Sequence, residues 1–303
     1  MELAGHGAAG ARQAHTRLMA KHKLFCVPGT WEAVAAANGN PGGITPGAEI
    51  GMLRGVTDLL NRSVFDIVYV NYPASFGPIA GGGEDVLAAL GNPSYLKSRD
   101  MGVAEVKRLI GEHQGSFGLL GYSQGGAVVS LVGRELVSGS LTARQRDCRW
   151  LHAIASPHRG RGRTFHLGNQ LAYEGISGDN IVNSGTIDWF DYCLQGDIYG
   201  NADIRGTYLK QGYDLVTPLS LMDPFAMIAQ IAANLVGWLE SGELGPLSIF
   251  RAVKTGFDLG IFLRDYPHDK YGVWDIIPGW TALRHSANHL NFWGPRLPTS
   301  IIV

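Results

Sequence analysis

The segment "GLLGYSQGG", from Gly118 to Gly126, places Ser123 between two glycines at the spacing G-x-S-x-G. The chain has 42 Gly among 303 residues, so the pattern alone carries little weight and its flanks must decide. The apolar run "SFGLLGY" precedes the serine and predicts a buried strand, and "GGAVVSLVGRELVSG" follows it and predicts a helix. A serine on such a strand–turn–helix junction is typical of an exposed nucleophile at the N-terminus of a helix.

Further strands and helices alternate around this segment. The apolar or β-branched runs at 23–30, 64–73 and 149–157 predict three more buried strands. Helical spacing of apolar residues follows the first of these runs, and it recurs from about 94 to a stop at Gly115. Alternating strands and helices imply βαβ units, so the predicted fold class is α/β with a central, mostly parallel sheet.

The section from about Thr207 to Asp265 differs, because it is rich in helical patterns. "DPFAMIAQIAANLVGWLESG" places apolar residues on one face of an amphipathic helix, with Pro224 suited to its first turn. A second helical stretch, "SIFRAVKTGFDLGIFLRD", follows. The expected organisation is an N-terminal tail at 1–22, a core formed by 23–206 and 266–303, and a helical insertion at 207–265.

Composition narrows the possible classes of function. Lys and Arg number 25 against 26 Asp and Glu, which argues against a nucleic-acid-binding surface. Three widely spaced cysteines, Cys26, Cys148 and Cys193, fit neither a disulfide framework nor a tetrahedral metal site. The first 22 residues lack the apolar run of a Sec signal peptide, so we expect synthesis in a cytoplasm.

A serine nucleophile needs a general base, an acid that orients it and an oxyanion hole. The amide of Gln124, directly after the nucleophile, is one expected oxyanion donor, and the amide or hydroxyl of Thr30 in "VPGTWE" is the other. In this fold class the acid and then the histidine follow the serine along the chain. Spacing leaves the acid open among seven residues: Asp179, Asp188, Asp191, Asp197, Asp203, Asp214 and Asp223.

Three histidines follow these acids and could serve as the base. His268 lies in "DYPHDKYG", a Pro- and Gly-bounded segment that predicts a loop. His285 and His289 stand four residues apart on a predicted terminal helix. That pair could in principle bind a metal ion, but no HExxH motif or third ligand accompanies it, so we expect solvated or core histidines there.

Several of these segments, from about Lys23 to Tyr271, resemble the mycobacteriophage lysin B family, which are cutinase-like serine esterases of the α/β-hydrolase fold. "GYSQGGAVV" resembles the family's nucleophile elbow, and "LFCVPGT" resembles its first strand and oxyanion loop, although Pro28 stands where the family usually has His. "DYCLQGDIYGNA" resembles the acid loop and so selects Asp197, while "YPHDKYG" resembles the Pro-His loop and selects His268. "NHLNF" also resembles the ending of some cutinase-like enzymes, which keeps His289 as a rival base.

The resemblance implies a substrate and a place of action. The substrate would be the mycolyl ester of mycolylarabinogalactan in mycobacterial-type cell walls, with no metal or organic cofactor and with the insertion covering the active-site face. The enzyme would be made in the host cytoplasm and act at the envelope, with possible peripheral contact with its lipid layer. Two alternatives stay open: a cutinase or lipase acting on other lipid or polyester esters, and a non-catalytic protein that binds cell wall or lipid.

Overall fold

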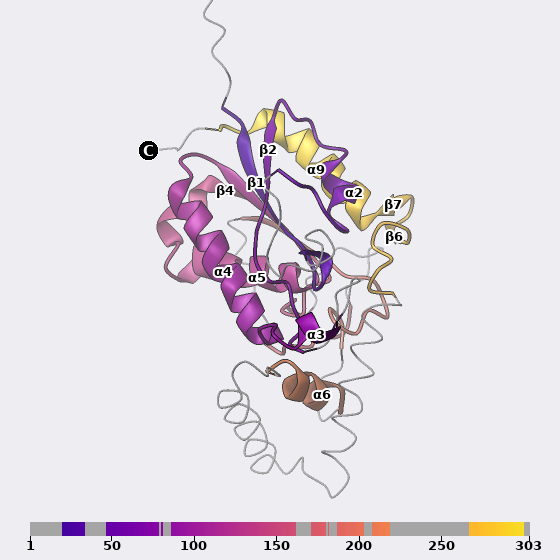
Figure 1. Ribbon diagram of the computed structural model, residues 1–303. Helices are drawn as coiled ribbons and strands as arrows, with labels where there is room; N and C mark the ends of the chain where they lie inside the picture. Colours follow the sequence, from indigo (N-terminus) through magenta and orange to yellow (C-terminus); the bar gives the residue numbers. More distant parts are fainter. Residues whose placement is uncertain are drawn as a thin grey trace, which may run out of the picture.

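The computed structural model describes residues 20–33, 47–78, 80, 86–161, 171–179, 181, 187–202, 208–218 and 267–299. Their centre is a five-stranded, fully parallel sheet with the strand order β2-β1-β3-β4-β5 (Figure 1). The strands are β1 (His22–Val27), β2 (Phe65–Tyr69), β3 (Phe117–Tyr122), β4 (Cys148–Ile154) and β5 (Asp188–Tyr192). The chain turns to opposite sides of β1 to form β2 and β3, and such a reversal opens a crevice at the carboxyl ends of the strands.

Helices cover both faces of this sheet (Figure 1). On one face lie α4 (Tyr95–Glu112) and α5 (Gln124–Ser138), which pack against each other, and α5 contacts β3 and β4. On the other lie α2 (Arg54–Thr57) and α9 (Ala282–Trp293), which also contact each other. Side-chain caps define two of the helix starts, because the Ser94 hydroxyl accepts from the Lys97 N–H and the Thr281 hydroxyl accepts from the Arg284 N–H.

The core lies where these helices bury the sheet. All six residues of β3 are buried, and Trp150 on β4 is fully buried between the layers. Strands buried on both faces read as continuous apolar runs, which is why the sequence predicts β1 and β3 well. The three cysteines are unpaired and buried.

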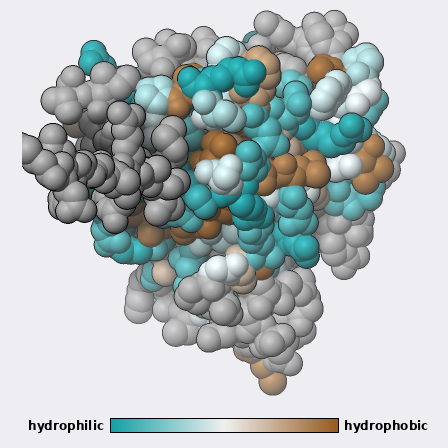
Figure 2. All heavy atoms as spheres, turned by 90° about the horizontal axis from the view of Figure 1, so that it is seen from above, coloured by the Kyte–Doolittle hydropathy of each residue, from teal (hydrophilic) through white to brown (hydrophobic). Residues whose placement is uncertain are grey.

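The remaining described elements are short. They are α3 (Val86–Ala89), η1 (Thr142–Asp147), α6 (Tyr208–Val216), η2 (Gly294–Arg296) and the antiparallel strands β6 (Asp275–Ile277) and β7 (Trp280–Thr281). The face seen in Figure 2 alternates hydrophilic side chains with separate hydrophobic patches. Within the described ranges, no helix combines the length and the apolar character needed to cross a membrane.

Part of the expected division into tail, core and insertion can be compared with the described residues. The first strand begins at His22, one residue inside the expected tail, and α6 lies within the expected insertion at 207–265. The predicted amphipathic helix from Pro224, the stretch after it and most of the tail fall outside the described residues. The division into core and insertion therefore stays a prediction.

Candidate active site

Ser123 occupies a strained turn between β3 and α5. Its backbone has φ 55° and ψ −117°, a region that non-glycine residues rarely adopt. The turn is tight because α5 packs directly against the end of β1: a Cβ on Gly125 would lie 1.9 Å from the Val27 carbonyl oxygen. At the other side of the turn, a Cβ on Gly121 would lie 2.2 Å from the Gly125 carbonyl oxygen. Both positions require glycine for close backbone approach, as the sequence pattern predicted.

The structure brings Ser123 together with two of the predicted partners. The Nε2 atom of His268 lies 2.8 Å from the Ser123 hydroxyl oxygen, and its Nδ1 atom lies 3.0 Å from Oδ2 of Asp197. All three residues are buried. Their sequence separations are 145 and 71 residues, so only the folded sheet edge assembles this chain of hydrogen bonds.

The surroundings of Asp197 favour its ionised form. Burial by itself raises the carboxyl pKa, but the nearby His268 and three hydrogen bonds outweigh burial and hold the pKa below its usual value. Besides His268, the Tyr271 hydroxyl donates to Oδ2 at 2.6 Å and the Tyr199 backbone N–H donates to Oδ1 at 2.9 Å. An ionised carboxylate can only accept, so Nδ1 of His268 carries the proton and Nε2 of the neutral ring can accept one from Ser123.

Aromatic side chains fix the histidine loop. The Tyr122 hydroxyl donates to the backbone oxygen of His268 at 2.8 Å, and the two ring centroids lie 5.3 Å apart. The ring of Tyr199 packs against the imidazole from another side at 5.3 Å, close to perpendicular. Tyr122 precedes the nucleophile directly, so one strand end positions both the serine and the base.

The loop after β1 passes close to the serine. A Cβ on Gly29 would lie 2.7 Å from the Tyr122 ring and 3.2 Å from Cβ of Ser123, which places the backbone beside the nucleophile. Oε2 of Glu32 accepts from the Gly29 N–H at 2.6 Å, and Oε1 accepts from the Met52 N–H at 2.7 Å. A second brace comes from the Tyr72 hydroxyl, which donates to the Pro28 carbonyl at 2.6 Å.

The two predicted oxyanion donors belong to this neighbourhood. Thr30 follows Gly29 in the braced loop, and Gln124 begins α5, where backbone N–H groups have no intrahelical partner. Within the described ranges, neither N–H donates to another protein group. The Gln124 side chain is held apart, because it accepts from the Ser98 hydroxyl and donates to the Ser75 carbonyl.

The other candidates lie elsewhere. His289 and His285 are on α9, where Nε2 of His289 lies 2.9 Å from Asp188 and Nδ1 of His285 lies 2.9 Å from the Tyr192 hydroxyl. His289 is therefore not the histidine beside Ser123. In the described part of the chain, no group of three or more His, Cys, Asp or Glu side chains is arranged to hold a metal ion.

The remaining carboxyl candidates have other surroundings. Asp179 pairs with His158, Asp214 pairs with Lys210, and Asp191 is buried on β5. Asp203 and Asp223 fall outside the described residues.

Sequence reasoning missed Glu32 and Tyr271. Tyr271 contacts Asp197, which is far away along the chain, and Glu32 contacts backbone N–H groups. Neither contact leaves a spacing pattern in the sequence. Tyr271 stands in the same "YPHDKYG" segment as the histidine, and this short separation was the one available signal.

Comparison with solved structures identifies proteins of similar fold. No family model matches the sequence, and no curated protein matches it. Among solved structures, lysin B from mycobacteriophage D29 is similar with a TM-score of 0.52 and 20% identity, over 90% of this chain and 98% of that one. A cutinase-like protein from Cryptococcus sp. gives a TM-score of 0.41 and 16% identity, over 79% and 96% of the two chains. With its parallel sheet and flanking helices, the chain has the α/β-hydrolase fold.

Proposed function

We propose that the protein is a serine esterase in which Ser123, His268 and Asp197 form the catalytic triad. The observation that carries this proposal is the continuous hydrogen-bonded chain from the Ser123 hydroxyl through both nitrogens of His268 to Asp197. The strained elbow and the oriented histidine tautomer support the same role, because each serves to present an activated hydroxyl.

In the acylation step, the Ser123 hydroxyl oxygen attacks the ester carbonyl carbon while His268 Nε2 takes its proton. The carbonyl oxygen becomes an oxyanion, for which the N–H groups of Gln124 and Thr30 are the donors in this proposal. Asp197 stabilises the imidazolium that forms. When the C–O bond to the alcohol breaks, Nε2 returns the proton to the leaving alkoxide.

In the deacylation step, water replaces the alcohol. His268 takes a proton from the water as its oxygen attacks the acyl-enzyme carbonyl. Collapse of the second tetrahedral intermediate releases the acid, and the proton returns to the serine oxygen. The enzyme ends in its starting state, so this cycle requires only the chain's own residues and water.

The substrate proposed is the mycolyl ester of mycolylarabinogalactan, cleaved at the host envelope during phage-induced lysis. It is supported by the ordered elbow, acid-loop and Pro-His motifs together with the shared fold. Hydrolysis of other lipid or polyester esters is the competing reaction, and the two are separated by mass analysis of lipids released from mycobacterial wall.

The nucleophile is tested with purified wild type and Ser123→Ala on p-nitrophenyl butyrate and with a fluorophosphonate probe. We expect covalent labelling and turnover in the wild type and loss of both in the variant. Full activity of Ser123→Ala would refute the assignment, and an unlabelled wild type that still binds envelope would favour a non-catalytic binding protein.

The base is tested by comparing His268→Ala with His289→Ala in the same assay. We expect His268→Ala to lose activity and His289→Ala to retain it, because only His268 contacts the serine. The opposite outcome would transfer the role of base to His289.

A further inference from the structure

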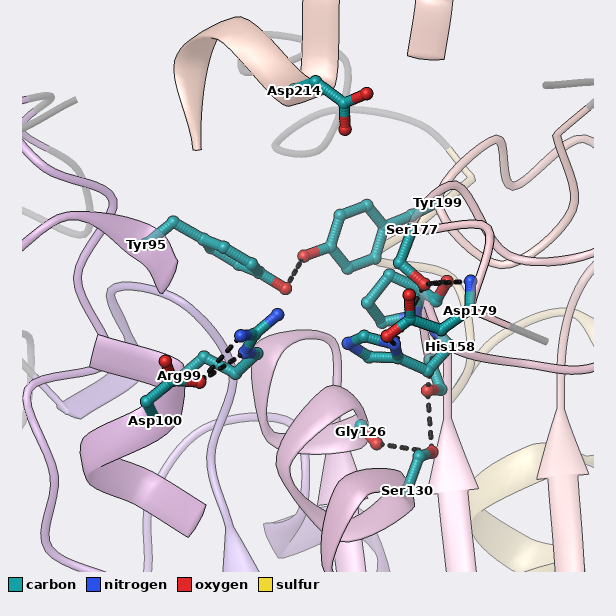
Figure 3. A network of polar contacts seen from close by, with 12 residues as sticks. Tyr95, Arg99, Asp100, Gly126, Ser130, His158, Ser177, Asp179, Tyr199 and Asp214 are labelled. Carbon is teal, nitrogen blue, oxygen red and sulfur yellow. Dashed lines mark hydrogen bonds and ion pairs between the residues drawn. The ribbon is translucent and has the colours of Figure 1, made fainter. Parts of the chain in front are cut away.

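A second cluster of polar side chains lines a pocket of about 390 Å³ away from the triad. Among its lining residues are Arg99, His158, Ser177, Asp179, Lys210 and Asp214. Figure 3 shows all of these except Lys210. Tyr213 also lines it, and the Tyr213 ring packs against Tyr199, which in turn packs against His268. Two aromatic rings therefore separate this pocket from the base of the triad.

His158 presents an unused acceptor in this pocket. The residue is only 1% exposed, and its Nδ1 atom lies 3.0 Å from Oδ2 of Asp179 and 2.9 Å from the Ser177 hydroxyl. The hydrogen bond from His158 lowers the pKa of Asp179, while burial lowers the pKa of His158 itself. An ionised Asp179 must accept from Nδ1–H, so Nε2 of the neutral ring bears a lone pair.

That Nε2 atom is buried and has no hydrogen-bond partner among the described residues. Buried polar atoms are seldom left unpaired in folded proteins, so such an atom on a pocket wall indicates a site for a bound molecule. In Figure 3 the free edge of the imidazole faces Arg99.

Arg99 supplies the matching donor. Its Nε and Nη2 atoms both donate to Oδ1 of Asp100, at 2.9 and 2.7 Å, and its side chain is 18% exposed. In the described part of the chain, Nη1 makes no hydrogen bond to protein. One hydroxyl group between the two side chains could donate to Nε2 of His158 and accept from Nη1 of Arg99, as neither a purely donating nor a purely accepting group could.

The charges on the pocket wall favour an uncharged ligand. The lining carries two cations, Arg99 and Lys210, and two carboxylates, Asp179 and Asp214. Lys210 pairs with Asp214, and Arg99 pairs with Asp100, so each cation already has a carboxylate partner. A phosphate or carboxylate would meet these carboxylates as like charges. A sugar carries several neighbouring hydroxyls that both donate and accept, which suits closely spaced carboxylate, imidazole and guanidinium groups.

We propose that this pocket binds a neutral sugar residue, with one sugar hydroxyl bridging His158 and Arg99. The choice of sugar polymer rests on the proposed function: the polysaccharide part of the ester substrate would be held here while Ser123 attacks the acyl group. Binding itself needs no hydrolysis, so the two proposals can fail separately.

The test is calorimetric titration of the full chain with soluble arabinogalactan from which all esters have been removed. We expect wild type and Ser123→Ala to bind equally, and Arg99→Met and His158→Gln to bind at least tenfold more weakly. Arg108→Met is the matched control, because Arg108 lies on the same helix and pairs with Glu105 and Glu112, outside this pocket. Melting temperatures establish whether each variant is folded. If the substitution of the buried His158 prevents folding, Arg99→Met alone tests the site.

Three outcomes would overturn the sugar site: no binding by wild type, equal binding by the folded Arg99→Met variant, or displacement of the polysaccharide by inorganic phosphate as a tighter ligand. If wild type binds arabinogalactan in the expected manner but cleaves no ester, the proposed function fails while the sugar site stands. If wild type cleaves esters without binding arabinogalactan, the reverse holds.

Discussion

Replacing Asp197 by Asn changes one oxygen of the candidate acid into an NH₂ group and keeps its size. The carbonyl oxygen would stay where the Tyr199 N–H donates, so the new amide nitrogen would occupy the place of Oδ2, 3.0 Å from Nδ1 of His268. An amide N–H can only donate, so Nδ1 must then accept and the imidazole proton moves to Nε2. The nitrogen that faces Ser123 becomes an N–H and cannot take the hydroxyl proton.

The expected cost follows from this change of tautomer. A triad with intact geometry but the wrong histidine tautomer loses about 10⁴-fold in kcat, equivalent to about 5.4 kcal/mol in the barrier. The Tyr271 hydroxyl, which donates to Oδ2, also loses its acceptor, so we expect a further small loss of stability.

The assay is steady-state hydrolysis of p-nitrophenyl butyrate at pH 8, with circular dichroism to establish folding. Asp188→Asn is the matched control, because it makes the same chemical change in a carboxylate that pairs with His289 instead of His268. We expect the control to stay within about threefold of wild type. A folded Asp197→Asn variant with activity within tenfold of wild type would refute the tautomer argument.

Three further predictions concern the oxyanion loop, the elbow and the core. Glu32→Gln replaces one of the two carboxylate oxygens that accept from loop N–H groups, so the loop should lose its position beside the serine. We expect kcat to fall by at least about tenfold, and at most by the roughly 10²–10³ of a lost oxyanion donor, with KM unchanged. An unchanged kcat would show that Glu32 does not position the oxyanion loop. Gly125→Ala should lower the free energy of unfolding in urea by more than about 3 kcal/mol, because the new Cβ would overlap the Val27 carbonyl oxygen. Gly111→Ala is the control: it has open space around it, so the free energy of unfolding should stay the same or rise. Burial holds the pKa of His152 well below its usual value, so only the unfolded chain takes up a proton at this residue as the pH falls. Below about pH 6.5 the free energy of unfolding should therefore decrease, by up to about 1.4 kcal/mol per pH unit. His152→Phe should flatten that slope between pH 6.5 and 5.5, and an unchanged slope would contradict the assignment.

The parallel sheet and the elbow were predictable because their signals are local. An apolar run, a Gly-flanked serine and a helical pattern lie within about 25 consecutive residues from Ser116 to Gly139, and the structure has β3 and α5 there. The strand β5 was not predicted, because "DWFDY" carries two aspartates and pairs only along one edge, with β4. An edge strand with acidic residues lacks the continuous apolar run that identified the others.

The supporting residues of the site were not predictable in the same way. Spacing left seven carboxyls open for the acid, and only the fold brings one of them to His268. Tyr271 and Asp197 are 74 residues apart, and Glu32 acts on backbone N–H groups. Such contacts depend on how loops meet at the sheet edge, which hydrophobic periodicity does not describe.

The contact between Tyr122 and His268 has a consequence for how this fold can be altered. The described contacts of the histidine come from Tyr122 and Ser123 at the end of β3, from Asp197 and Tyr199 in one loop, and from the ring of Tyr271. A substitution at Tyr122 should therefore displace the nucleophile and the base together, because Tyr122 directly precedes Ser123 and its hydroxyl holds the backbone oxygen of His268. The distance between the hydroxyl and the imidazole would then be a property of one strand end, and a single side chain there would be enough to alter it.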